Sequence, residues 1–266
     1  MTEQTDDSLT PPRAVLVGVV GGAFSGLFGL GGGIVMVPLL TSLGGLTQRR
    51  AGAYSLAAIL PAAIVGSIPY LTHQAVDLVA AGLLVVGSVA GAVVGARLLA
   101  RVPETLLRWL FVGVLVAGIV RSLLDGFGEP PSVDTAEGLP SLLDGAGMVG
   151  LGLVMGIASG LLGIGGGQIA VPGLSALFDF APALAKGTSL VAMIPTAVSG
   201  TWVNTRNGLV RLRTAALIGV VASAFSYGGA SLSVVLPDRV ASVAFAALLV
   251  FALVQQVRKA LEKHTR

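Results

Sequence analysis

The sequence predicts an all-α integral membrane protein made of two homologous inverted repeats. Three observations support this fold class. Hydrophobic residues make up 54% of the 266 residues and charged residues only 11%, whereas a soluble domain carries about 25% charged residues. Apolar segments of about 20 residues, the length of a membrane-spanning helix, recur along the chain. The glycine-rich phrase GLFGLGGGIVMVP at 26–38 returns as GLLGIGGGQIAVP at 160–172.

Apolar segments follow one another at 14–43, 51–71, 78–99, 106–123, 145–177, 187–203, 214–236 and 240–257. The first and fifth are longer than one span and contain the glycine phrase. We predict that each of these two enters the membrane, breaks at the glycines and turns back, with half-helices of about 12–16 residues. The other six are predicted to span the membrane. The alternative is eight simple spanning helices, four in each half.

An offset of 134 residues relates the two halves. It carries three prolines onto three others, Pro38, Pro61 and Pro103 onto Pro172, Pro195 and Pro237, which chance does not readily supply. Internal repeats of this kind are typical of secondary transporters. The predicted divisions are a cytoplasmic tail at 1–13, repeat one at 14–123, an acidic extracytoplasmic linker at 124–144, repeat two at 145–257 and a basic cytoplasmic tail at 258–266.

The distribution of Lys and Arg favours the turned-back arrangement. If every segment crosses once, the 16 basic residues divide 9 to 7 between the two sides; if the two glycine segments turn back, they divide 13 to 3. Because cytoplasmic loops carry an excess of Lys and Arg, we expect both termini in the cytoplasm. Each repeat then has an odd number of passes, which makes the repeats inverted. The small net charge of +3 and the basic residues at helix ends indicate membrane orientation and no nucleic-acid partner.

The glycine phrases predict a binding site at the centre of the membrane. Irregular backbone is tolerated there only inside protein or beside a wet cavity. A helix that begins at such a break directs N–H groups and the positive end of its dipole at the centre, which suits an anion. Two inverted repeats would bring two such helices to one site. The candidate substrate-binding residues are Ser25, Gly31, Gly32, Gly33, Ser55, Ser159, Gly165, Gly166, Gly167, Gln168, Lys186, Thr188, Ser189 and Asn204.

Several of the candidate residues, and the glycines that precede each phrase, could instead have a structural role. Gly18, Gly22, Gly26 and their copies are spaced like small-residue packing faces, and we favour packing for them. The hydroxyls of Ser25 and Ser159 could instead bond to their own helix. Lys186 could be a surface lysine that extends toward the interface.

Enzymatic chemistry finds no support. The glycine phrase is not followed by GK[ST], and no strand–helix unit surrounds it, so it is neither a P-loop nor a dinucleotide fingerprint. The chain has no cysteine and only two histidines, His73 and His264, which form no metal cluster. We therefore expect no catalytic residue, no metal, no cofactor and no enzymatic activity. The acidic N-terminus, which lacks a positive n-region, predicts no cleaved signal peptide. No carboxylate lies deep in an apolar segment, so any coupling must use another device, such as sodium on backbone carbonyls.

The doubled motif resembles the TauE/SafE family of sulfite exporters. The resemblance covers 14–257 and rests on Gly29, Gly31, Gly32, Gly33 and Pro38, their copies Gly163, Gly165, Gly166, Gly167 and Pro172, and the stretches KGTSL at 186–190 and PTAVSG at 195–200. It implies a secondary transporter in the lipid bilayer of the bacterial cytoplasmic (inner) membrane, moving sulfite or another small organosulfonate-type sulfur anion. The alternatives are an anion channel of the same architecture and a membrane scaffold subunit. The anion, the direction, the coupling ion and homo-oligomer formation stay open.

Overall fold

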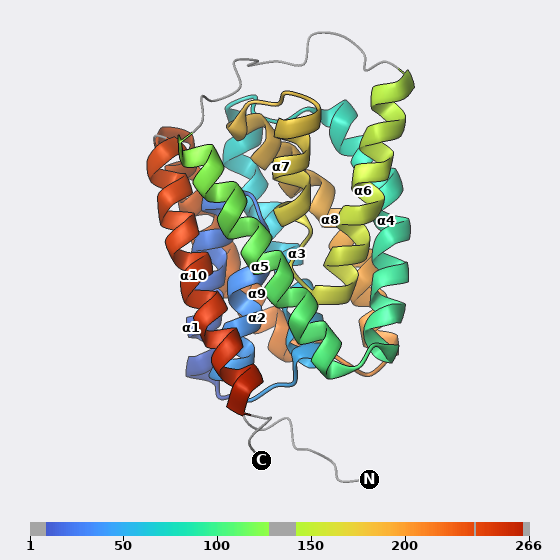
Figure 1. Cartoon of the computed structure of the whole chain (residues 1–266), viewed down its shortest axis with the longest axis vertical. Helices are drawn as coiled ribbons and strands as arrows, with labels where there is room; N and C mark the ends of the chain where they lie inside the picture. The colour runs from blue at the N-terminus through green and yellow to red at the C-terminus, as the bar shows by residue number, and fades with distance from the viewer. Residues whose placement is uncertain (1–8, 128–141, 237, 263–266) are drawn as a thin grey trace.

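The computed structural model describes residues 9–127, 142–236 and 238–262, and every regular element within these ranges is a helix. The predicted all-α fold is therefore confirmed. Figure 1 shows the helices as an upright bundle. In chain order they are α1 (Pro11–Phe28), α2 (Gly33–Ser42), α3 (Gln48–Thr72), α4 (Leu78–Arg101), α5 (Glu104–Phe127), α6 (Leu142–Leu162), α7 (Gly167–Leu177), α8 (Pro182–Arg206), α9 (Leu212–Val235) and α10 (Asp238–Glu262).

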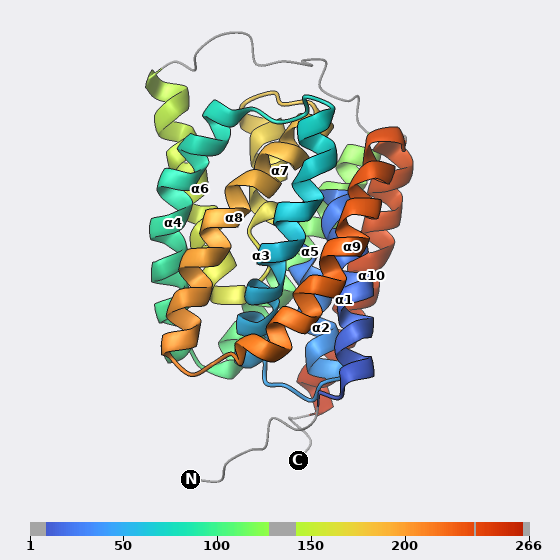
Figure 2. The same cartoon turned by 180° about the vertical axis from the view of Figure 1, so that it is seen from behind.

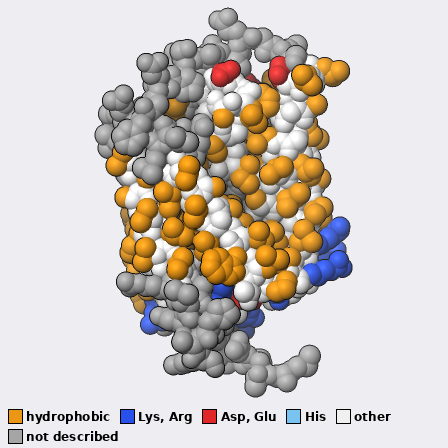
Figure 3. Space-filling view, in the orientation of Figure 1, with side chains coloured by type: hydrophobic (Ala, Val, Ile, Leu, Met, Phe, Trp, Pro, Cys, Tyr) orange, Lys and Arg blue, Asp and Glu red, His pale blue; other side chains and the backbone are white. Residues whose placement is uncertain are grey.

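The outer surface of the bundle is apolar, as a lipid environment requires. Large hydrophobic side chains such as Val86, Val220 and Phe251 are 65%, 66% and 57% exposed, and Figure 3 shows such side chains covering the middle of the molecule. Among the described helices, α1, α3, α4, α6 and α9 are long and apolar enough to cross a membrane. An exposed apolar surface of this extent marks a protein that is embedded in a membrane.

Both glycine segments turn back. The guanidinium of Arg13, at the start of α1, donates a hydrogen bond of 3.0 Å to the carbonyl of Leu43, just beyond the end of α2. In the second half, a Cβ built on Gly147 of α6 would lie 3.1 Å from the ring of Phe178, which follows α7. The start of the first helix thus lies beside the end of the second in each pair. Figures 1 and 2 show the same two hairpins, α1 with α2 and α6 with α7.

The two arms of each hairpin differ in length, which the sequence-based prediction of similar half-helices missed. The first arms, α1 and α6, have 18 and 21 residues, whereas the second arms, α2 and α7, have only 10 and 11. At 1.5 Å per residue the long arm covers about 27–32 Å and the short arm about 15–17 Å. The break therefore comes at the far end of each long arm, and the short arm that follows it covers only part of the height of the bundle.

The helix bounds repeat with the offset seen in the sequence. Adding 134 to the bounds of α3 and α4 gives the bounds of α8 and α9. The two halves run in opposite senses, because α1 begins at the lower end of Figure 1 and α6 at the upper end. These observations agree with inverted repeats, and the turned-back hairpins do not fit eight simple spanning helices. The homology of the repeats stays a prediction.

Charged side chains gather at the two ends of the bundle. Figure 3 shows Lys and Arg at the lower end and Asp and Glu at the upper end of the face in view. Lys186 departs from this pattern: it lies inside α8 and is only 9% exposed, which does not fit the alternative of a surface lysine. Most of the predicted acidic linker, 124–144, and parts of the two predicted tails lie outside the described residues.

Glycines bring the long hairpin arms into backbone contact with helices of the other half. A Cβ built on Gly22 of α1 would lie 2.5 Å from the Cα of Ala222 in α9. Likewise, a Cβ on Gly156 of α6 would lie 2.7 Å from the Cα of Ser88 in α4. Small residues allow such close approach of membrane helices. The predicted packing role of these glycines is therefore confirmed.

We expect Gly156→Val to lower the thermal unfolding midpoint of the detergent-solubilised protein. The new side chain would overlap the backbone of α4, and overpacking of this kind costs about 1–3 kcal/mol or more. The matched control is Gly150→Val in the same helix, because a Cβ there has no neighbour within 4 Å. Equal midpoints for the two variants would contradict the packing role.

Candidate functional site

Each short arm begins at a glycine that other residues fit poorly. Gly32 and Gly166 are the N-cap residues of α2 and α7, with φ of 68° and 85°. Such positive φ values place a Cβ in steric conflict with the backbone, so glycine is strongly preferred. A Cβ on Gly32 would in addition overlap the carbonyl oxygen of Gly21, and one on Gly166 would lie 2.9 Å from that of Met155. The backbone turn and the crowding around it thus both require glycine.

The two glycine turns meet. A Cβ built on Gly33 would lie 2.7 Å from the Cα of Ile164, and one on Gly167 would lie 2.6 Å from the Cα of Leu30. Between these contacts, a Cβ on Gly31 would lie 3.4 Å from the Cα of Gly165. Residues 134 positions apart in the sequence are therefore neighbours. The predicted meeting of the two breaks is present in the structure.

The two helix N-termini at this meeting point offer hydrogen-bond donors. In α2, Val35 and Met36 are the first residues to donate to the Gly32 carbonyl, at 3.1 and 3.0 Å. In α7, Ile169 and Ala170 donate to Gly166 in the same way. The N–H groups of the residues before them have no acceptor within their own helix. Two positive dipole ends and these donors therefore converge where the turns meet, an arrangement that favours negative charge.

Buried hydroxyl groups lie beside the turns. Ser25 and Ser159 are fully buried, and their Oγ atoms have no hydrogen-bond partner among the described residues. The Cβ of Ser25 lies 3.1 Å from a Cβ built on Gly32. Ser55 donates a 2.7 Å hydrogen bond to the Gly163 carbonyl of the second turn. Ser189, its equivalent at the offset of 134, is buried with no partner for its Oγ in the described part of the chain. An unpaired buried hydroxyl is costly, so a ligand here would satisfy these groups.

Two apolar side chains cover the meeting point of the turns, and the sequence analysis did not single them out. The Met193 sulfur lies 2.8 Å from a Cβ built on Gly31 and 3.1 Å from one on Gly165. Ile59 lies 3.3 and 3.1 Å from the same two positions. Ile59 and Met193 are themselves 134 residues apart, and both are fully buried. In this conformation both side chains pack against both turns. One signal in the sequence could have identified them, because the two residues occupy equivalent positions in the two halves.

Lys186 lies against the first glycine turn. A Cβ built on Gly29 would lie 2.5 Å from the Cβ of Lys186. The ammonium group of Lys186 extends to α9, where it donates a 3.4 Å hydrogen bond to Ser233. Lys186, Ser189 and Met193 follow one another at spacings of three and four residues and so share one face of α8. That face is turned toward the glycine turns.

The remaining candidates are not brought to the meeting point. Thr188 is two residues from Lys186 and accepts a 3.0 Å hydrogen bond from the Asp77 N–H at the start of α4. Asn204 is buried but lies 11 residues further along α8 than Met193, about 16 Å along the helix axis. The amide of Gln168 extends toward Gly118 of α5 instead of the partner turn.

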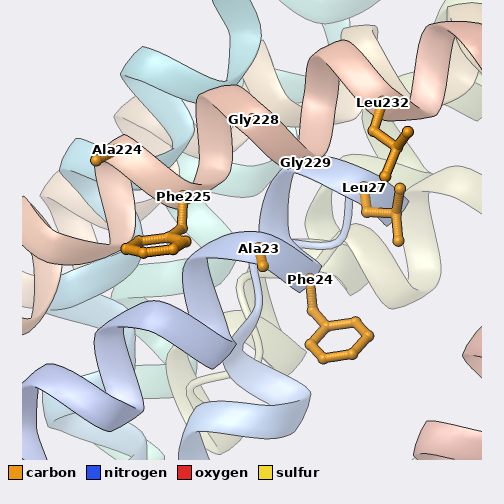
Figure 4. A pocket seen from close by; sticks show the side chains of 8 residues that line it. All are labelled: Ala23, Phe24, Leu27, Ala224, Phe225, Gly228, Gly229 and Leu232. Carbon is orange, nitrogen blue, oxygen red and sulfur yellow. The ribbon is translucent and has the colours of Figure 1, made fainter.

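A groove elsewhere on the surface is apolar throughout. Figure 4 shows it between α1 and α9, with Phe24 and Phe225 among the side chains around it. Since it faces outward and presents no polar side chain, it offers nothing that would recognise a small anion.

Both halves of the chain match a known family. The model described as sulfite exporter TauE/SafE matches residues 2–122 and 148–266, which include the first hairpin and, apart from the first six residues of α6, the second. The chain belongs to this family. The resemblance carried by the doubled glycine motif is therefore confirmed, and the TauE/SafE hairpins are α1–α2 and α6–α7.

The relatives of this TauE/SafE protein are described as membrane transporters. It is 26% identical over 212 residues to the probable membrane transporter protein YunE of Bacillus subtilis, which covers 70% of this chain and 75% of YunE. It is 33% identical to YdhB of the same organism, over 42% of this chain and 46% of YdhB, and 27% identical to MamO of Magnetospirillum gryphiswaldense, over 42% of this chain and 19% of MamO. No solved structure matches. Family and relatives indicate a multi-pass membrane transporter and not an enzyme.

Proposed function

We propose that the protein is a secondary transporter for a small sulfur-containing anion, either sulfite or an organosulfonate-type anion. The observation that carries this proposal is the meeting of the two glycine turns, with the N-termini of α2 and α7 and the buried hydroxyls of Ser25 and Ser159 beside it. Backbone N–H groups and hydroxyls donate hydrogen bonds to anionic oxygen atoms without placing a fixed charge in the membrane. The family description supports the choice of sulfur anions.

An alternating carrier fits the site better than an open channel. A channel needs a continuous polar path, whereas Ile59 and Met193 cover the point where the turns meet. Those two side chains, or the helices that hold them, must move before an anion can bind. In a carrier, such movement opens the site to one side at a time. We further propose that the protein lies in the bacterial cytoplasmic membrane with both termini in the cytoplasm, since basic residues gather at the end where α1 begins.

Flux measurements on purified protein in proteoliposomes test this proposal. We would supply sulfite, sulfate, thiosulfate, sulfoacetate and acetate separately, with and without proton and sodium gradients. We expect saturable flux of at least one sulfur anion, stimulated by the same anion on the opposite side. Flux that rises linearly without exchange stimulation would favour a channel instead.

The control is empty liposomes, together with a check that the reconstituted protein is folded and monodisperse. If folded protein moves none of the five anions, the sulfur-anion assignment fails. A scaffold role would then be tested by co-purification.

A further inference from the structure

The polar lining around the glycine turns is not symmetric. Lys186 and Ser233 are 9% and 7% exposed and are joined by the 3.4 Å hydrogen bond between α8 and α9. Subtracting 134 gives their equivalents in the first half, Gly52 and Leu99. Neither equivalent has a polar side chain. A lysine–serine pair thus lies beside one turn, and the equivalent positions in the other half do not form such a pair.

A second pair of equivalent residues also differs in polarity, and again the polar residue belongs to the second half. Ser226 of α9 is fully buried, has no partner for its Oγ among the described residues, and lies against Gly66 of α3. Its equivalent in the first half is Ala92 of α4, since 226 − 134 = 92. Ser226 and Ser233 are two turns apart on α9 and so share a face of that helix. Ser226 and Ser233 are polar, whereas their equivalents on α4, Ala92 and Leu99, are apolar.

The position of Lys186 and Ser233 in the bundle indicates which path of the anion they would affect. Lys186 is seven residues, or about 10 Å, from Met193 along α8. Because α8 descends from the upper end in Figure 2, Lys186 lies between the meeting point of the turns and that end. An anion moving from the turns toward the upper end would therefore pass close to this lysine.

We propose that Lys186 and Ser233 form a second binding position for the transported anion, on the route between the glycine turns and the upper end of the bundle. The proposal rests on the transport function proposed above. The ligand is a small oxoanion, because an ammonium and a hydroxyl together donate to anionic oxygen. In the hairpin–helix arrangement of the other half, Gly52 and Leu99 provide no such position. The affinity for the anion therefore differs between access from the upper end and access from the lower end of the bundle.

Flux of radiolabelled sulfite, measured separately from each side of the membrane, tests this second position. We expect Lys186→Gln to raise the half-saturating sulfite concentration about tenfold, equivalent to about 1.4 kcal/mol, when sulfite is supplied at the upper end. The value for sulfite supplied at the lower end, where α1 begins, should change less than about twofold, since the equivalent positions in the first half, Gly52 and Leu99, hold no cation. Ser233→Ala should act in the same direction with a smaller effect.

Two further variants keep the test decisive. Lys186→Arg retains the charge and should restore most of the affinity at the upper end. Ser231→Ala is the matched control in the same helix, because that hydroxyl bonds to the carbonyl of Tyr227 at 2.9 Å. If Lys186→Gln does not fold, the test of the second position rests on the other two variants. Ser233→Ala should weaken affinity at the upper end, and Lys186→Arg should retain most of it.

The outcomes separate this proposal from the proposed function. Unchanged affinity at both sides, or an equal change at both sides, would overturn the second position while transport by the protein stands. An absence of saturable sulfite flux in the folded wild-type protein would overturn both.

Discussion

Replacing Gly32 with Val is expected to abolish anion transport, and replacing Gly166 with Val should do the same. Each glycine begins a short arm with a positive φ that a β-branched residue rarely adopts. The new side chain would also meet the backbone of the long arm of the same hairpin, at Gly21 and Met155 respectively. The helix N-terminus would then move, and a displacement of about 1 Å at a reacting site can cost a hundredfold in rate. We expect flux near the background of empty liposomes.

The matched control is Gly113→Val in α5, where a Cβ would have no neighbour within 4 Å. Flux, expression and size-exclusion profile are measured for all three variants. The glycine-turn site would be rejected if Gly32→Val and Gly166→Val transport as well as the control does. Loss of folding in one variant is recognised from its elution profile, so the other still provides the test.

Shortening both side chains that cover the turns is expected to produce an anion leak. In the double variant Ile59→Ala, Met193→Ala, the covering atoms disappear from the point where two helix N-termini meet. Space beside polar groups admits water, unlike an apolar void. We expect non-saturating anion efflux at least about tenfold above that of the wild-type protein, on the view that the covering side chains raise the barrier by more than about 1.4 kcal/mol. Efflux from chloride- and sulfite-loaded proteoliposomes measures this directly.

Stability is the competing explanation for such a leak, because large-to-small core substitutions cost about 2–5 kcal/mol each. Leu184→Ala is the control: it removes a buried side chain from the same helix as Met193 and from the apolar cluster that also contains Ile59 and Met193. A leak in the double variant and none in Leu184→Ala would support the covering role. Comparable efflux from both would assign the effect to loosened packing.

Much of the fold could be predicted because its elements leave a direct record in the sequence. Long apolar segments are bounded by charged residues and prolines, and the glycine phrases mark the breaks. The lengths of the hairpin arms could not be predicted in this way. They depend on where a positive φ begins, and the first such residue, Gly29, lies at the end of an 18-residue helix.

The candidate site was predicted less completely, for reasons of helix geometry. Residues two apart on a helix face different directions, so Thr188 points to α4 although it is close to Lys186 in sequence. Burial of Lys186 could not be read from a local pattern, because a lysine near a helix start is usually exposed. Ile59 and Met193 are apolar residues among many, and only their contacts with the two turns distinguish them.

The packing of α1 against α9 has a consequence for how the protein is made. Gly22 of α1 finds its neighbour, Ala222, 200 residues later in the chain. At a synthesis rate of about 5–20 residues per second, the ribosome needs roughly 10–40 s to produce that partner. During this interval the first hairpin must stay in the bilayer without the helix it packs on. Assembly therefore ends with a long-range docking step, and a first half expressed alone should remain open to degradation until the second half is supplied.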